Sequence, residues 1–133
     1  MAPNSESGDV FPLPEVRERR VRSGEQYLEF LRIPEMSVGF YAQPAGGTDT
    51  QTPHREDEIY YVVRGRSMIS IAGRDRLVET GATIFVARGV EHRFHTITEP
   101  LELLVVFAPA ETADPPAPPP AAPSGRDPPT KVS

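Results

Sequence analysis

The amino-acid sequence predicts an all-β domain with antiparallel strands, either a sandwich or a barrel. Short segments in which apolar and polar residues alternate recur along the chain, and they are rich in β-branched and aromatic residues. Turn-forming glycine and proline residues separate these segments at short intervals. Between residues 25 and 109, no segment with the period of a helix reaches the usual helix length. Short strands with turns at this spacing are typical of antiparallel sandwiches and barrels.

Each predicted strand is bounded by residues that favour a turn. Pro34 ends the first strand, and a loop of small polar residues at 44–53 follows the second. The short Gly73–Asp75 turn predicts a hairpin, and turns near Gly89 and Pro100 separate the later strands. In chain order, the predicted strands lie at residues 25–33, 36–43, 58–65, 67–72, 76–79, 83–87, 92–97 and 101–107.

Several of these strands are apolar on both faces. In the segment IYYVV, Tyr60 and Val62 point to one side, whereas Ile59, Tyr61 and Val63 point to the other. A single sheet that faced water on its outer side would carry polar residues there. We therefore expect another sheet or another subunit to cover the second face, and we predict a homodimer.

The two ends of the chain differ in composition from its centre. The first residues are polar and punctuated by prolines, and VRERRVR at 16–22 is interpreted as a solvated segment that leads into the first strand. From Pro109 onward the chain consists almost entirely of alanine, proline and small polar residues, which cannot form a core. The sequence thus predicts a flexible N-terminal segment at 1–20, a barrel domain at 21–109 and a disordered tail at 110–133.

Composition also limits the function classes. The net charge is −5 and the isoelectric point is near 5.2, which argues against nucleic acid or an anionic membrane as the main partner. The chain has no cysteine, so it forms no disulfide and offers no thiolate to a metal or a substrate. The N-terminus lacks an apolar signal region and no stretch is long enough to span a bilayer. We expect a cytoplasmic protein.

Histidine and carboxylate residues form the candidate site. In an extended chain His54, Glu58 and Tyr60 point to the same side, and His92 begins another strand, so the two histidines and the carboxylate would converge inside a barrel. Imidazole and carboxylate ligands suit divalent iron, manganese, nickel, cobalt or zinc. His95 is expected to face away. The alternative is that His54 and Glu58 form an exposed charged pair and that His92 caps a turn.

Two stretches of the chain resemble the two motifs of the cupin superfamily. PHREDEIYYVVRG at 53–65 is similar to the first motif, G-x5-H-x-H-x3-4-E-x6-G, with His54 at its second histidine, Glu58 at its glutamate and Gly65 at its closing glycine. The resemblance spans roughly residues 36–108. It implies an antiparallel jelly-roll (cupin) barrel with flexible tails, which holds a metal in its interior.

The second motif, G-x5-P-x-G-x2-H-x3-N, is similar to GATIFVARGVEH and the residues after it. Gly81, Gly89 and His92 match it in spacing, whereas Ala87 replaces its proline and Thr96 its asparagine. The resemblance implies that His92 is a metal ligand together with the histidine and glutamate of the first motif.

The chain departs from the first motif at one ligand. The first histidine of the motif falls on Thr52, and a neutral threonine is a poor ligand for these metals. The amide oxygen of the adjacent Gln51 would reach the metal if the loop turned. Gln51, water or substrate are therefore the candidates for the fourth position.

Three function classes follow from this site. The favoured one is a small metal-dependent enzyme, an oxygenase for example, that acts on a small organic molecule at the open metal positions. The second is an isomerase, cyclase or lyase in which Glu58, His92 or Tyr60 acts as acid or base. The third is a non-catalytic small-molecule-binding protein. The inferred interior is apolar and aromatic and has no arginine cluster, which favours an aromatic or polyketide-like ligand over a phosphosugar.

Overall fold

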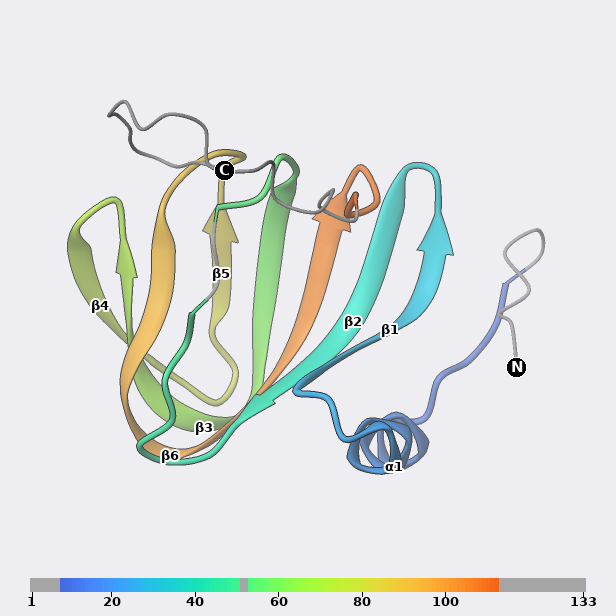
Figure 1. The fold of residues 1–133 in the computed structure, drawn as a ribbon, viewed down its shortest axis with the longest axis horizontal. Helices are drawn as coiled ribbons and strands as arrows, with labels where there is room; N and C mark the ends of the chain where they lie inside the picture. Colours follow the sequence, from blue (N-terminus) through green and yellow to red (C-terminus); the bar gives the residue numbers. More distant parts are fainter. Residues whose placement is uncertain (1–7, 51–52, 113–133) are drawn as a thin grey trace, which may run out of the picture.

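The computed structural model describes residues 8–50 and 53–112 and shows one short helix and a six-stranded antiparallel sheet (Figure 1). The strands run in the order β1-β2-β6-β3-β4, and β5 pairs with β3 outside this path. The predicted all-β antiparallel fold is confirmed. In chain order, the elements are α1 (Leu13–Ser23), β1 (Tyr27–Ile33), β2 (Met36–Gln43), β3 (Asp57–Ile71), β4 (Arg74–Glu79), β5 (Thr83–Val86) and β6 (His92–Ala108).

The two longest strands, β3 and β6, bend at the base of the molecule (Figure 1). Both ends of each strand therefore lie at the rim of the barrel that is opposite this base. They pair with each other along almost their whole length. The first half of β3 also pairs with β5, and its second half pairs with β4. Each long strand thus contributes to both walls of the barrel, and the start of β3 and the start of β6 lie at the same rim.

The sequence predicted two strands in place of β3 and two in place of β6. The hydrogen-bonded ladder between β3 and β6 continues through both predicted breaks. Its register shifts three times on β3, between Val62 and Arg64, between Arg64 and Arg66, and between Arg66 and Met68. The turn expected near Pro100 is wrong, and the residue instead lies inside β6. Proline has no amide hydrogen to donate, so the ladder must be irregular there, and the irregularity allows the strands to bend.

Gly65 lies close to the backbone of β6 in this bend. Its φ is +111°, and a Cβ atom at this position would lie 2.3 Å from the carbonyl oxygen of Pro100 on β6. A side chain there would have both an unfavourable backbone conformation and a clash with a backbone atom that cannot move away cheaply. The two paired strands can therefore approach each other this closely at the base because residue 65 is glycine.

The interior is filled by side chains that alternate along β3 and β6. On β3, Tyr60, Val62 and Ile69 are fully buried, whereas Tyr61, between the first two, is 43% exposed. Phe94 and Leu103 of β6 meet them in the same cluster. Burial of such side chains is worth about 1.5–3 kcal/mol each relative to exposure. The period-two pattern of the sequence therefore matches the interior of the barrel.

Residues 13–20, which were predicted to be flexible, are helical, so the prediction of a flexible segment through residue 20 is wrong for them. Helix α1 has a proline in its first turn, Glu15 near its N-terminus and basic residues in its last turn, and it ends at Gly24 in the left-handed conformation. Its apolar stripe is narrow, and only Val16 is fully buried. A helix with so few apolar residues shows no clear period in the sequence.

Helix α1 covers part of the outer face of the sheet. Val16 packs with Phe30 and Phe40 in a second apolar cluster. Arg17 holds the helix to β6, because its Nε and Nη2 donate hydrogen bonds to the two carboxylate oxygens of Glu102 at 2.9 and 2.7 Å. The Arg17 guanidinium keeps the pKa of Glu102 below its usual range. The cover expected from another sheet or subunit is here supplied in part by the same chain.

The chain that follows β6 also packs on the barrel. Residues 110–112 were predicted to belong to a disordered tail, yet the amide of Ala110 donates to the carbonyl of Pro34, and that of Glu111 donates to the hydroxyl of Ser37. We call residues 109–112 the C-terminal strap. Of the remaining predicted tails, residues 1–7 and 113–133 lie outside the described residues. In the described part of the chain, no helix has the length and apolar character needed to cross a membrane.

Replacing Gly65 by alanine should destabilise the protein much more than replacing Gly73. Both residues have positive φ, but a Cβ at Gly73 would meet nothing within 4 Å. Gly73→Ala should therefore cost only the conformational term, about 1–2 kcal/mol, whereas Gly65→Ala should cost at least about 2 kcal/mol more because of the clash with Pro100. Urea denaturation of the two variants measures the difference, and equal losses would show that the bend tolerates a side chain.

Candidate metal centre

Three of the predicted ligands meet at the rim of the barrel. His54 precedes β3, Glu58 is the second residue of β3 and His92 is the first residue of β6. One ligand atom from each lies within 4.8 Å of the other two. They meet because the bends in β3 and β6 return both strands to the same rim. The turn between β5 and β6 is tied to the first motif, since the amide of Gly89 donates to the carbonyl of His54 at 2.8 Å.

The carboxylate of Glu58 is the least satisfied polar group of this cluster. The residue is 2% exposed, and neither oxygen has a hydrogen bond of regular geometry within the described residues. Its Oε1 lies 3.1 Å from Nε2 of His92, a contact of opposite charges only when the imidazole is protonated. A buried carboxylate without such partners is costly. Because a bound cation would remove this cost, Glu58 and its two histidine neighbours fit a divalent transition metal.

The ring of His92 is held from both sides. Its Nδ1 lies 2.9 Å from the carbonyl oxygen of Val90, to which it donates, and its Nε2 lies 3.0 Å from the hydroxyl of Tyr60. Burial lowers the pKa of His92, but the nearby Glu58 carboxylate raises it, and the net shift is upward. The donation to Val90 leaves Nε2 directed toward Glu58, as a metal-binding histidine requires.

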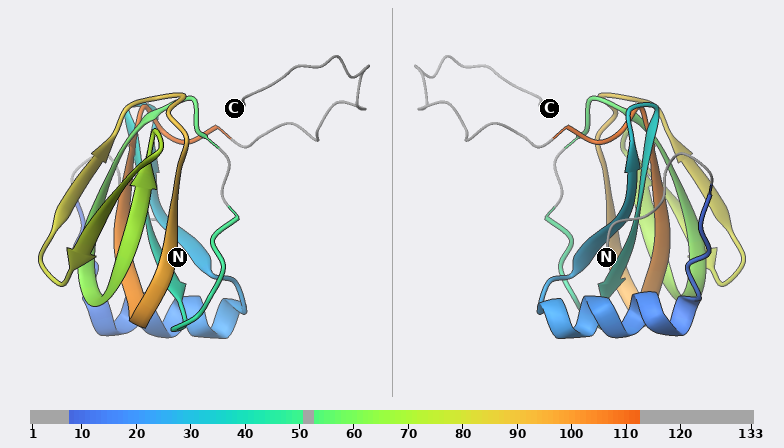
Figure 2. Two further views of the ribbon diagram at one scale, coloured as in Figure 1. Left: turned by 90° about the vertical axis from the view of Figure 1, so that its left-hand side faces the viewer. Right: turned by 90° about the vertical axis from the view of Figure 1, so that its right-hand side faces the viewer.

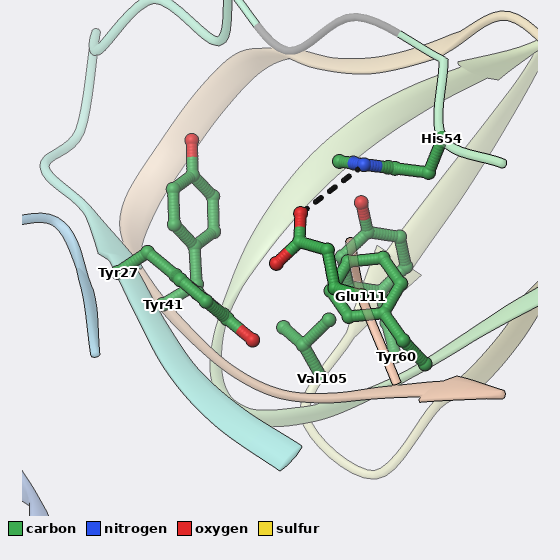
Figure 3. A pocket seen from close by; sticks show the side chains of 7 residues that line it. Tyr27, Tyr41, His54, Tyr60, Val105 and Glu111 are labelled. Atoms are coloured by element: carbon green, nitrogen blue, oxygen red, sulfur yellow. Dashed lines mark ion pairs between the residues drawn. The ribbon is translucent and has the colours of Figure 1, made fainter. Parts of the chain in front are cut away.

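His54 lies nearer to the surface than the other two residues of the cluster. Its ring packs edge-on against Phe107, with centroids 4.7 Å apart, and its Nδ1 lies 3.3 Å from Oε2 of Glu111. Glu111 belongs to the C-terminal strap. The strap therefore contributes a carboxylate to the surroundings of a predicted metal ligand (Figure 3).

A cavity of about 200 Å³ adjoins this cluster. Figure 3 shows that Tyr27, Glu111 and His54 face one another across it. The hydroxyl of Tyr27 is buried without a hydrogen-bond partner among the described residues, and burial raises its pKa well above the usual range. The phenol therefore stays protonated and can donate to a ligand. The cavity is lined by Tyr27, Tyr41, His54, Tyr60, Val105, Phe107 and Glu111.

Sequence reasoning predicted His54 and Tyr60 and missed the other five lining residues, among them Tyr27, Tyr41 and Glu111. Tyr27 and Tyr41 lie on neighbouring strands and pair with each other, but nothing in their local pattern distinguishes pocket lining from core. Glu111 follows the last strand in a segment whose composition suggests a tail. Its nearest signal is its position directly after the apolar run of β6, where a short excursion across the barrel rim is geometrically possible.

The remaining predicted site residues have different outcomes. Gln51 and Thr52 lie outside the described residues, so the fourth ligand position stays a prediction. Tyr60 lies within the site, in contact with His92. His95 lies away from the metal cluster, as expected, and its Nε2 is 3.0 Å from Asp75 on β4.

Comparison with known proteins places this geometry in a family. The family model described as "Cupin domain" (Cupin_2) matches residues 39–107. An uncharacterized protein of Streptomyces coelicolor is 46% identical over 103 residues, which cover 77% of this chain and 98% of that protein.

Solved structures share the fold. An RmlC-like cupin from Shewanella frigidimarina superposes with a TM-score of 0.57 at 21% identity, over 63% of this chain and 75% of that chain. KdgF from Halomonas sp. has a TM-score of 0.57 at 19% identity, over 62% and 76%. The DMSP lyase DddQ from Ruegeria pomeroyi has a TM-score of 0.54 at 23% identity, over 57% and 39%. With two motifs in register and a matching barrel, the chain belongs to the cupin family.

Proposed function

We propose that this protein is a small metal-dependent enzyme that holds one divalent transition metal with His54, Glu58 and His92 and acts on a small organic molecule. The observation that carries the proposal is the buried Glu58 carboxylate. It has no regular hydrogen-bond partner among the described residues, and one ligand atom of Glu58 lies within 4.8 Å of one from each of His54 and His92. Nitrogen and oxygen ligands of this kind suit iron, manganese, nickel, cobalt or zinc. Three protein ligands leave positions open for substrate or water, as catalytic sites require.

The residues around the cluster have separate tasks in this proposal. A bound metal supplies Lewis acidity or, if it is redox-active, the activation of oxygen. The Tyr60 hydroxyl lies at the boundary between the metal ligand His92 and the cavity, so it can donate a proton or a hydrogen bond to a substrate oxygen. The protonated phenol of Tyr27 offers a second donor from the other wall. Val105 and Phe107 exclude water from the apolar part of the ligand.

The lining of the cavity supports a small, uncharged or weakly polar substrate. Its volume of about 200 Å³ is below the roughly 300–1,000 Å³ typical of pockets for drug-sized ligands. Three tyrosines and two apolar residues line it, and no arginine or lysine is among the lining residues. Phosphate groups bind to arginine, lysine or clustered backbone amides, so an oxygen-bearing aromatic compound fits better than a phosphosugar.

A second candidate function is a lyase, isomerase or cyclase that uses acid–base chemistry. The contacts of His92 favour it, because Nε2 is 3.1 Å from Glu58 and 3.0 Å from Tyr60 and thus links a carboxylate to a phenol. One of the proteins with a similar fold is named a lyase. A non-catalytic binding protein is the third candidate, in which the same cavity only holds its ligand. The cytoplasm remains our proposed location.

Loss of either histidine should remove most of the metal. His54→Ala and His92→Ala each leave two protein ligands, whereas Glu58→Gln keeps an oxygen but loses the anionic charge and should weaken binding to a smaller extent. Elemental analysis after loading with zinc or iron measures the metal content, and circular dichroism verifies the fold. His95→Ala is the matched control and should keep wild-type metal content. A folded His92→Ala protein with full metal content would place the ion elsewhere.

The identity of the metal should decide the type of reaction. If the enzyme is an oxygenase, the iron-loaded protein should consume oxygen in the presence of small phenols, and the zinc-loaded protein should not, because zinc has no redox chemistry. An oxygen electrode with a panel of such phenols measures this. Turnover by the zinc-loaded protein without oxygen uptake would instead support the lyase or isomerase.

We also propose that a second copy of the chain covers the exposed apolar strip formed by Ile59, Tyr61 and Phe85. These side chains lie on paired strands β3 and β5 and are 43%, 43% and 60% exposed. Helix α1 covers a different part of this face, with Val63 and Leu104 beneath it. A strip of aromatic and branched residues on an open sheet is costly to leave in water.

Sedimentation at micromolar concentration should therefore give about twice the chain mass. Phe85→Glu should shift the wild-type dimer to a monomer without changing its metal content, because residue 85 faces away from the cavity. A wild-type monomer at all accessible concentrations would exclude this arrangement.

A further inference from the structure

The C-terminal strap is held against the barrel by its own backbone. The amide of Glu111 donates to Oγ of Ser37 at 2.9 Å, and its carbonyl oxygen accepts a hydrogen bond from the guanidinium of Arg32. Ser37 is fully buried, so this anchor is shielded from water. Strands β1 and β2 thus hold the backbone of Glu111 in place.

The strap is also tied to the segment that carries the metal ligands. Both the amide and the hydroxyl of Thr112 donate to Oε2 of Glu56, at 3.1 and 2.5 Å. Glu56 is 4% exposed and lies between His54 and Glu58 in the chain. The same short segment therefore carries two predicted ligands and the anchor of the strap.

The Glu111 side chain points back over the cavity toward His54. Its Oε2 lies 3.3 Å from Nδ1 of His54 (Figure 3). Within the described residues, the cluster whose ligand atoms all lie within 4.8 Å of one another comprises His54, Glu58 and His92, without Glu111. Glu111 is therefore in contact with His54 without being a member of this cluster.

In both His54 and His92, the ring nitrogen Nδ1 lies close to an oxygen atom that can accept a hydrogen bond. Nδ1 of His92 donates to the carbonyl of Val90, and Nδ1 of His54 faces a carboxylate. Metal-binding histidines commonly donate their second ring N–H to a carboxylate or a carbonyl, which sets the tautomer and the ring orientation and strengthens the nitrogen that binds the metal. Both rings would direct Nε2 into the cluster.

We propose that Glu111 is a positioning residue for His54. Its carboxylate accepts a hydrogen bond from Nδ1–H of the imidazole, so that Nε2 is presented toward Glu58 and His92. The benefit to metal binding rests on the proposed function, whereas the hydrogen bond itself exists in the metal-free protein.

The tautomer of His54 tests the hydrogen bond without any metal. Two-bond nitrogen–proton NMR spectra of the metal-free protein, at a pH where the ring is neutral, distinguish Nδ1–H from Nε2–H, and His54→Gln identifies the signals. We expect Nδ1–H in the wild type. Glu111→Ala should give a mixture with substantial Nε2–H, and Glu111→Gln, which keeps an acceptor oxygen, should stay closer to the wild type. An Nε2–H tautomer in the wild type, or no change in Glu111→Ala, would overturn the proposal.

Zinc affinity, measured by competition with a chelator, tests the consequence for the metal centre. Glu111→Ala should bind zinc about 10- to 100-fold more weakly, with a smaller loss for Glu111→Gln. Glu79→Ala, an exposed glutamate on β4, is the matched control and should bind as the wild type does. Unchanged affinity in folded Glu111→Ala contradicts the positioning role. Absence of zinc binding in the wild type would contradict the proposed function, and the tautomer measurement distinguishes that failure from failure of the His54–Glu111 hydrogen bond.

Discussion

The close approach of the paired strands β3 and β6 at Gly65 and Pro100 is the constraint on which the site depends. Both strands bend there, and each returns to the rim at which it began (Figures 1 and 2). Glu58 on β3 therefore comes to face His92 on β6. Their pairing partners on the ladder are other residues, since Glu58 lies opposite Phe107 and His92 opposite Ile71. Glu58 and His92 are thus neighbours across the barrel and not along the sheet. Loss of the bend would separate them without altering either residue.

The buried Glu58 carboxylate lowers the stability of the barrel. An apolar residue in its place would pack without desolvating a charge. The chain instead places the carboxylate beside His92, whose raised pKa reflects the need for a positive partner in the metal-free protein. Tyr60, Phe94 and Leu103 are fully buried in one apolar cluster, and the burial of these side chains offsets the cost. In the function we propose, the same arrangement holds His54, Glu58 and His92 ready for a cation, which would otherwise have to assemble them.

Elements outside the strands pack on both faces of the sheet. Helix α1 covers part of the outer face through Val16 and is clamped by the Arg17–Glu102 pair. On the inner side, the C-terminal strap crosses the rim and adds Glu111 to the cavity. Both elements precede or follow the barrel in the chain, and both were assigned to flexible ends from their composition. The proline, arginine and alanine residues of these segments are typical of exposed chain. A few partly buried contacts, such as Arg17 with Glu102 and Glu111 with Ser37, hold the two segments in place.

The sequence by itself determined the strand class, the alternating interior and the identity of the clustered residues His54, Glu58 and His92, because period-two alternation and motif spacing are local properties of the chain. Tertiary structure alone decided that predicted strand pairs fuse into β3 and β6, since a bulge and a turn share the same glycine and proline signals. It also decided that Glu111 meets His54 and that Tyr27 lines the cavity. These contacts join residues far apart in the chain, and their geometry follows from the packing of the bent sheet, which no local pattern encodes.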